Sequence, residues 1–196
     1  MKLATMLHAV LVAWLLGTAG CSQGPATDES WKPVASDSLT ASQKTQKEEA
    51  IAAKETMFKR LMAKLMKELS SGPAHAIGVC QDEAPRIARE VGTENRVRIG
   101  RTALKLRNAN NQAPEWAKGL VEKRIAEPTF LANGRGDFAA LLPIRLQPPC
   151  LLCHGDHSGM SGEVLDALAK RYPNDQATGF REGDLRGWFW VEVPAR

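Results

Sequence analysis

The sequence predicts an α+β domain in which helices flank an antiparallel β-sheet. Two observations lead to this class. A long amphipathic helical segment opens the folded part of the chain, and the segments after it run in the order helix, strand, helix, strands, helix, strand, with no internal repeat. The chain has 196 residues, of which 43% are hydrophobic, and this is enough for one domain with a sizeable core.

The long helix is expected over residues 43–69. Apolar side chains recur there at intervals of three and four residues, and Lys and Glu fill the other face. These apolar positions are Ile51, Phe58, Leu61, Met62, Leu65, Met66 and Leu69. The run Ser-Ser-Gly-Pro at 70–73 ends the helix. Methionines at helical spacing, here Met57, Met62 and Met66, fill a core more often than they bind a metal.

Shorter elements are expected after this helix. A second helix covers residues 74–92 and is kinked near Pro85. Strands are expected at 95–104, 138–146 and 185–194, where β-branched, aromatic and other apolar residues gather. Further helices are expected at 115–127 and 163–172, with turns at 107–114 and 132–137.

The charge pattern argues against a nucleic-acid-binding protein. The formal net charge is +4, from 26 Lys plus Arg and 22 Asp plus Glu, and the two signs are interspersed. No basic stripe interleaved with aromatic residues appears. We therefore expect no nucleic-acid partner.

The N-terminus predicts an exported protein. Residues 1–20 resemble a signal peptide of the lipoprotein type, with Lys2, an apolar run over 7–16 and small residues directly before Cys21. Cys21 is then the lipidated first residue of a periplasmic protein anchored to a membrane. The alternative is cleavage nearby, with Cys21 incidental. Residues 21–42 are rich in Ser, Pro, Asp and Thr and are expected to form a flexible tether before the domain at 43–196.

The run Cys-Leu-Leu-Cys-His at 150–154 is the segment that indicates the chemistry of the protein, and it has four possible interpretations. A thioredoxin-like redox motif would not need a histidine directly after the second cysteine. A zinc site needs four ligands, and only His157 and the distant Cys80 could complete one. A disulfide between Cys150 and Cys153 would close a small, strained loop. Covalent haem attachment is the reading that this spacing favours.

The spacing suits haem c because two thiols three residues apart on a helical turn reach both vinyl groups. Cys150 and Cys153 would then hold the porphyrin, and His154 would be the proximal axial ligand of the iron. His157 and Met160 follow too closely to reach the opposite side. The sixth position is left to Cys80, to His75, to a methionine of the first helix, or to an open site.

Four ordered segments resemble the PAS-like family of single-haem c-type cytochromes, a haem-binding family of unknown function first characterised in cyanobacteria. These are AIGVCQDEAPRIA, VRIGRTALKLRNANNQAPEW, LLPIRLQPPCLLCHG and YPNDQATGFREGDLRGWFWVEVP. The resemblance covers about residues 43–194. It implies a PAS-like antiparallel sheet flanked by helices and one covalently bound haem. It also implies His154 and Cys80 as the two axial ligands.

Thiolate ligation predicts a low reduction potential, because a negatively charged ligand stabilises the ferric state. With both axial positions filled the protein is expected not to be an enzyme. It would act in electron transfer with redox partner proteins that the sequence does not identify. The alternative is a redox or ligand sensor that signals through a partner. Four arginines are candidates to pair with the haem propionates: Arg86, Arg89, Arg98 and Arg101.

Overall fold

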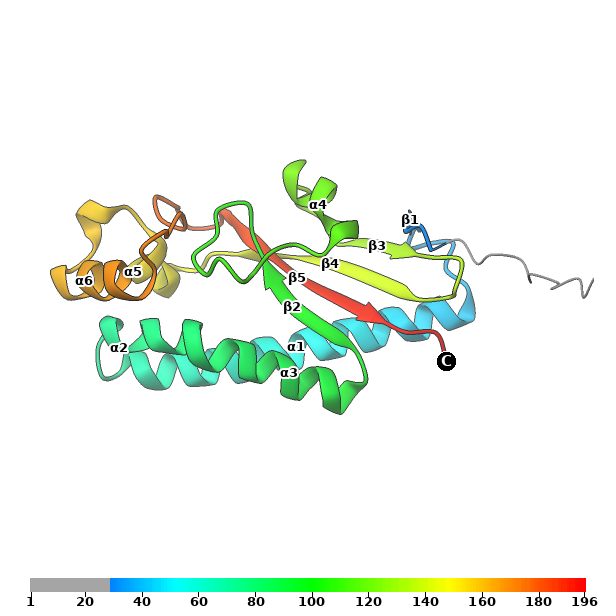
Figure 1. Ribbon diagram of the computed structural model, residues 1–196, viewed down its shortest axis with the longest axis horizontal. Helices are drawn as coiled ribbons and strands as arrows, with labels where there is room; N and C mark the ends of the chain where they lie inside the picture. The colour runs from blue at the N-terminus through cyan, green and yellow to red at the C-terminus, as the bar shows by residue number, and fades with distance from the viewer. Residues whose placement is uncertain (1–28) are drawn as a thin grey trace, which may run out of the picture.

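The computed structural model describes residues 29–196 as a five-stranded antiparallel sheet with helices around it (Figure 1). The strands lie in the order β1-β3-β4-β5-β2 and comprise β1 (Lys32–Pro33), β2 (Arg98–Thr102), β3 (Thr129–Ala132), β4 (Phe138–Arg145) and β5 (Leu185–Val193). The helical elements are α1 (Ala41–Leu69), α2 (Pro73–Gly78), η1 (Val79–Glu83), α3 (Ala84–Asn95), α4 (Glu115–Glu122), η2 (Pro148–Cys150), α5 (Leu151–His154), η3 (His157–Gly159) and α6 (Gly162–Arg171). The predicted α+β class, antiparallel sheet and long first helix are confirmed. Within residues 29–196 no helix is long and apolar enough to cross a lipid bilayer.

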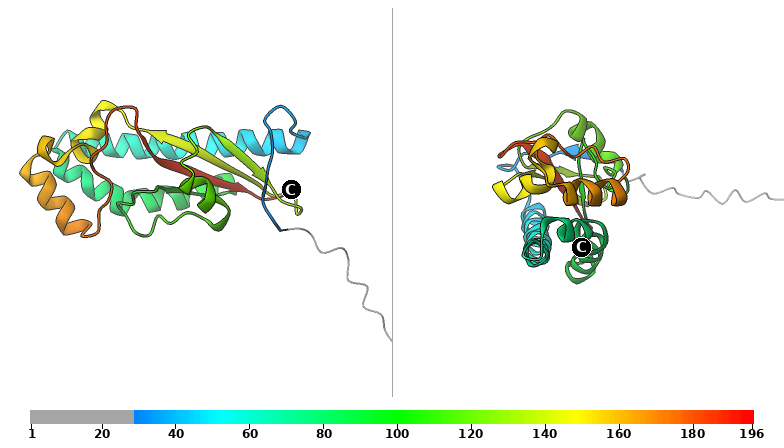
Figure 2. Two further views of the ribbon diagram at one scale, coloured as in Figure 1. Left: turned by 90° about the horizontal axis from the view of Figure 1, so that it is seen from above. Right: turned by 90° about the vertical axis from the view of Figure 1, so that its left-hand side faces the viewer.

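Helices α1 and α3 lie side by side on one face of the sheet, as the view along the long axis shows (Figure 2, right). Helix α1 begins with a capping box, in which Thr40 and Gln43 exchange side-chain and backbone hydrogen bonds. Its buried face consists of Gln46, Ala50, Ala53, Met57 and Leu61. Two residues of the predicted apolar face, Ile51 and Met66, are instead 38% and 50% exposed. The helix turns its small alanines toward the sheet because they allow the two backbones to approach closely.

The opposite face of the sheet is covered by α4 (Figure 1). Ala117 and Val121 of this helix pack against Leu141 and Trp188. The indole nitrogen of Trp188 donates to the carbonyl oxygen of Ile125 at 2.7 Å, so its buried polar atom is satisfied. Both faces of the sheet are thus apolar in β4 and β5, which explains why these strands read as nearly continuous hydrophobic runs.

The described part of the predicted tether, residues 29–42, packs against the domain. Strand β1 pairs with β3, the rings of Trp31 and Trp116 lie 5.9 Å apart, and Leu39 is buried in the main core. A few apolar side chains order this polar segment because the edge of the sheet and α4 offer them partners. The signal peptide at 1–20, Cys21 and the beginning of the tether lie outside the described residues.

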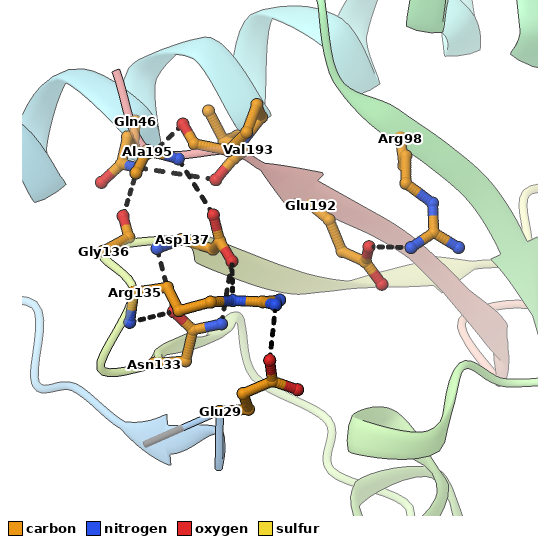
Figure 3. Close-up of polar contacts among 11 residues, drawn as sticks. Glu29, Gln46, Arg98, Asn133, Arg135, Gly136, Asp137, Glu192, Val193 and Ala195 are labelled. Atoms are coloured by element: carbon orange, nitrogen blue, oxygen red, sulfur yellow. Dashed lines mark hydrogen bonds and ion pairs between the residues drawn. The ribbon is translucent and has the colours of Figure 1, made fainter. Parts of the chain in front are cut away.

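A polar cluster joins the start of α1 to the predicted turn between β3 and β4 (Figure 3). The buried side-chain amide of Gln46 donates to the carbonyl oxygens of Gly136 at 2.9 Å and Pro194 at 3.3 Å. In the turn itself Asp137 accepts from the side chains of Asn133 and Arg135. The hydrogen bond from Asn133, together with the backbone amide of Ala195 and the charge of Arg135, lowers the pKa of Asp137.

The second predicted helix is a continuous helical segment made of α2, η1 and α3. Its irregular part is the π-helical turn η1, where the amide of Ala84 bonds to the carbonyl oxygen of Val79. Pro85 follows directly and has no amide hydrogen, so a regular α-helix could not continue past this point without losing a hydrogen bond. The irregularity predicted near Pro85 therefore falls on the turn that contains Cys80.

Helices α2, α5 and α6 gather at one end of the sheet (Figures 1 and 2). A small, separate hydrophobic core lies at this end, and it is formed by Ile77, Met160, Val164, Leu168 and Tyr172. Cys153 packs against this cluster. This end of the molecule therefore brings the second helical segment next to the Cys-Leu-Leu-Cys-His run.

Candidate functional site

A cavity at this end of the sheet contains all four predicted haem-site residues of the domain. Cys80, Cys150, Cys153 and His154 line it. The space free of protein atoms in the cavity and its open mouth is about 1280 Å³, a volume that includes open solvent. Its apolar wall is built mainly by Phe58, Leu61, Met62, Leu65, Ile77 and Phe189.

Most of the other candidate ligands lie outside the cavity. His75 and His157 are exposed and do not line the cavity. Met57 is buried in the main core, and Met66 is half exposed. Of the methionines of α1, Met62 lines the cavity. The placement thus leaves Cys80 and Met62 as the upstream candidates that face the same space as His154.

The Cys-Leu-Leu-Cys-His run forms one short helical segment, η2 followed by α5. Pro148 and Pro149 occupy its first positions, where a missing amide hydrogen costs nothing. Gly155 ends it, and its amide donates to the carbonyl oxygen of Leu151 at 3.0 Å. A Cβ atom on Gly155 would lie 2.7 Å from that oxygen, so the tight end of this helix requires glycine. Because Cys150 and Cys153 are three residues apart in this helical segment, they share one side of a turn.

The imidazole of His154 is held in a form that can bind a metal. Its Nδ1 lies 2.7 Å from the carbonyl oxygen of Ala177. Because a carbonyl oxygen only accepts, Nδ1 carries the proton and Nε2 keeps its lone pair. Burial lowers the pKa of His154 well below its usual value, and the charges of Arg107 and Arg186 lower it further. The ring is therefore neutral at neutral pH.

The segment around residues 175–180 straps the motif helix to the domain. The amides of Gly179 and Phe180 donate to the carbonyl oxygens of Gly155 at 2.7 Å and His154 at 3.0 Å. The ring of Phe180 meets that of His154 edge-on, with the centroids 6.4 Å apart. These contacts hold the backbone and the ring of His154 in place.

A buried ion pair supports the strap. The guanidinium of Arg107 bonds to the carboxylate of Asp175 at 2.9 and 3.0 Å, and their side chains are only 6% and 10% exposed. Arg107 also donates to the carbonyl oxygens of Cys153 and Ala177. One arginine thereby joins the motif helix to the residue that orients His154. Sequence reasoning missed this pair, because Arg107 stands in an apparent turn 68 residues before Asp175.

The three described cysteines are free thiols. The part of the chain that the structure describes also holds no group of three or more His, Cys, Asp or Glu side chains arranged to bind a metal ion. Burial raises the pKa of the Cys153 thiol; Arg107 opposes this shift, while Cys80 and Cys150 add to it. Cys80 lines the same cavity as the two motif cysteines.

Unsatisfied polar atoms concentrate in residues that line this cavity. Within residues 29–196, four buried side-chain atoms have no hydrogen-bond partner, and three of them belong to cavity-lining residues. These three are Thr102 Oγ1, Tyr172 Oη and Arg186 Nε. Buried polar groups normally have partners, so this concentration is typical of a site completed by a ligand.

Most of the arginines that are candidates for pairing with the propionates do not line the cavity. Arg86 pairs with Glu83 and Glu90 on the surface. Arg98 pairs with Glu192 at 2.6 Å, and Arg89 is exposed away from the cavity. Arg101 is the member of that set which lines the cavity, and Arg107, Arg145 and Arg186 line it as well.

Comparison with known proteins relates this chain to a cyanobacterial protein. The family model described as Tll0287-like (Tll0287) matches residues 36–194. Among solved structures, the crystal structure of the cyanobacterial haem protein Tll0287 superposes with a TM-score of 0.55 at 23% sequence identity. The match covers 74% of this chain and 95% of that chain. At this identity the superposition shows a shared fold. No curated protein matches this chain.

Proposed function

The chain belongs to the Tll0287-like family, and from this premise we propose that its cavity binds one covalently attached haem that serves in electron transfer. The observation that carries the proposal is the placement of Cys80, Cys150, Cys153 and His154 around one cavity. The unsatisfied polar atoms in the same wall support a missing ligand with polar groups.

Cys150 and Cys153 would form the two covalent links. Each thiol adds across one vinyl group of the haem, so that a C–S bond forms and the thiol proton goes to carbon, with no leaving group. Their place on one helical turn, closed by Gly155, keeps both sulfur atoms on the same side. The donor set of two thiols followed by a histidine fits this attachment.

His154 would be the proximal ligand through Nε2. Its hydrogen bond to Ala177 fixes the ring orientation and increases the basicity of the free nitrogen. Arg107 holds both the Ala177 carbonyl and the Cys153 carbonyl, so it positions the ligand and one thioether together. These contacts keep the imidazole in place independently of the iron.

Cys80 would be the distal ligand. It comes from the π-helical turn η1, a feature that is frequent at functional sites. A thiolate opposite an imidazole stabilises ferric iron, so the reduction potential should be low. The haem supplies a one-electron couple when bound. Because His154 and Cys80 would both be ligands of the iron, we do not expect an enzyme.

The setting of this function follows from the N-terminus. Lipidation at Cys21 would anchor an exported, periplasmic domain to a membrane, where it would exchange electrons with redox partner proteins. A sensor that signals through a partner would use the same haem but needs an axial ligand that leaves the iron.

Absorption spectra of oxidised and reduced protein, with and without carbon monoxide, test this proposal. We expect low-spin spectra and little carbon monoxide binding by the resting ferrous protein. The variant Cys80→Ser should keep its haem while its ferric spectrum changes and its potential rises. His75→Gln, a change at an exposed histidine, is the matched control and should leave both unchanged. An unaltered spectrum and potential in Cys80→Ser would overturn the ligand assignment. Ready carbon monoxide binding by the unmodified protein would favour sensing.

A further inference from the structure

Strand β5 carries one extra residue where it enters the cavity, and that residue is Arg186. Ile144 of β4 pairs with Gly187, but the next residue of β4, Arg145, pairs with Leu185. Arg186 therefore has no partner on β4 and forms a β-bulge. Bulges of this kind redirect a side chain, and they are common next to functional sites.

The bulge decides on which face of the sheet Arg186 lies. Along the regular part of β5, Phe189 and Val191 face the core under α1, whereas Trp188 faces α4. Strict alternation would place residue 186 on the same face as Trp188. Instead Arg186 lines the cavity together with Phe189, and Leu185 packs on the α4 side. The irregularity thus brings the Arg186 side chain to the wall of the cavity.

The guanidinium of Arg186 is only partly satisfied there. Its Nη1 donates to the carbonyl oxygen of Lys105 at 3.1 Å, and its Nε is buried without a hydrogen-bond partner in the described chain. Burial lowers the pKa of Arg186 to about 10, and the nearby positive charges of Arg107 and Arg101 contribute to this shift. A partly buried cation beside like charges is unfavourable unless an anion joins it.

The charges around the cavity do not balance. Four arginines line it, and no Asp or Glu does so in the described part of the chain. Arg107 is neutralised by Asp175, and Arg145 lies exposed at the rim. Arg101 and Arg186 form no ion pair within residues 29–196. Two positive charges are therefore left for a ligand.

We propose, on the basis of the function proposed above, that Arg186 and Arg101 form an anion site for the two propionate carboxylates of the haem. The charges match: porphyrin dianion and thiolate together balance ferric iron, so the haem's remaining charge resides on its two propionates. Arg101 is placed for this by register, since it lies on β2 opposite Phe189. A planar guanidinium such as that of Arg186 binds a carboxylate through two parallel hydrogen bonds.

The test uses the haem-loaded protein and the variants Arg186→Gln and Arg101→Gln. Arg98→Gln is the matched control, because Arg98 lies on the same strand as Arg101 but pairs with Glu192 outside the cavity. Resonance Raman spectra report the propionate bending modes, and redox titration reports the ferric–ferrous equilibrium. Each cavity variant should shift a propionate band. Each should also favour ferric haem by on the order of tenfold, a lowering of about 59 mV, because a positive charge near the haem is lost.

Arg186→Lys provides a second readout that does not depend on folding of the glutamine variant. It keeps the charge but not the planar fork, so the propionate band should shift while the potential stays near that of the unmodified protein. Propionate bands and potentials that match those of the control in Arg101→Gln and in both Arg186 variants would overturn the anion site. That result would leave the proposed function intact, because the haem would still be attached. Purified protein without haem would instead overturn the proposed function.

Discussion

The variant Asp175→Asn tests whether the buried ion pair holds the haem motif in place. The amide side chain of the variant can still accept the hydrogen bond that Asp175 Oδ1 receives from the amide of Ala177, at 2.7 Å in the structure. The substitution therefore removes the charge while keeping the size and one contact. Arg107 is left as an uncompensated cation whose side chain is 6% exposed.

Breaking a buried pair by removing one partner costs about 3–5 kcal/mol. In a domain of this size each kcal/mol lowers Tm by about 2–4 °C, so we expect a decrease of roughly 6–20 °C. Circular dichroism during thermal unfolding of the haem-loaded protein measures it. Arg98→Gln is the control, because Arg98 is 75% exposed and its pair with Glu192 should contribute about 0–1 kcal/mol. A decrease in Asp175→Asn no larger than in Arg98→Gln would refute the structural role of the pair.

Three further outcomes are expected. Gln46→Leu leaves the carbonyl oxygens of Gly136 and Pro194 without their donor and should lower the free energy of unfolding by about 1–3 kcal/mol in urea titrations, whereas no loss would contradict that contact. Gly187→Ala should lower the free energy of unfolding by about 1–3 kcal/mol and broaden the haem spectrum, because a Cβ atom there would lie 2.3 Å from the carbonyl oxygen of Thr102. A Tm equal to that of the unmodified protein would contradict this close contact. Asp137 has a lowered pKa in the folded state, so its carboxylate stabilises the fold above about pH 4. This stabilisation is lost as the pH falls through the pKa of the folded state. Asp137→Asn should therefore lose less stability than the unmodified protein on acidification, as measured by denaturant unfolding at several pH values.

Local patterns in the sequence were sufficient for the longer helices and the longer strands. The helical period over 43–69 and the breaker at 70–73 predict α1 within two residues of its observed bounds. The strands at 138–145 and 185–193 follow from their apolar and aromatic content. Strands β1 and β3 were not predicted, because they have only two and four residues and depend on pairing rather than on their own pattern.

The candidate site likewise contains residues that local patterns predict and residues that depend on the fold. Cys150, Cys153 and His154 are adjacent in sequence, so spacing alone identifies them. The ion pair of Arg107 and Asp175 depends on residues far apart in the chain, which no local pattern encodes. Arg186 required knowledge of strand register, because one extra residue in β5 moves it from one face of the sheet to the other.

The central claim is one haem bound covalently through two cysteines. It is tested by expressing the protein with a maturation system for c-type cytochromes, extracting it with acidified acetone, and measuring the mass of the remaining polypeptide. We expect the mass of one haem to remain on the unmodified chain and to be lost when Cys150 and Cys153 are both replaced by alanine. A colourless protein, or a haem that the solvent extracts from the unmodified chain, would contradict the claim.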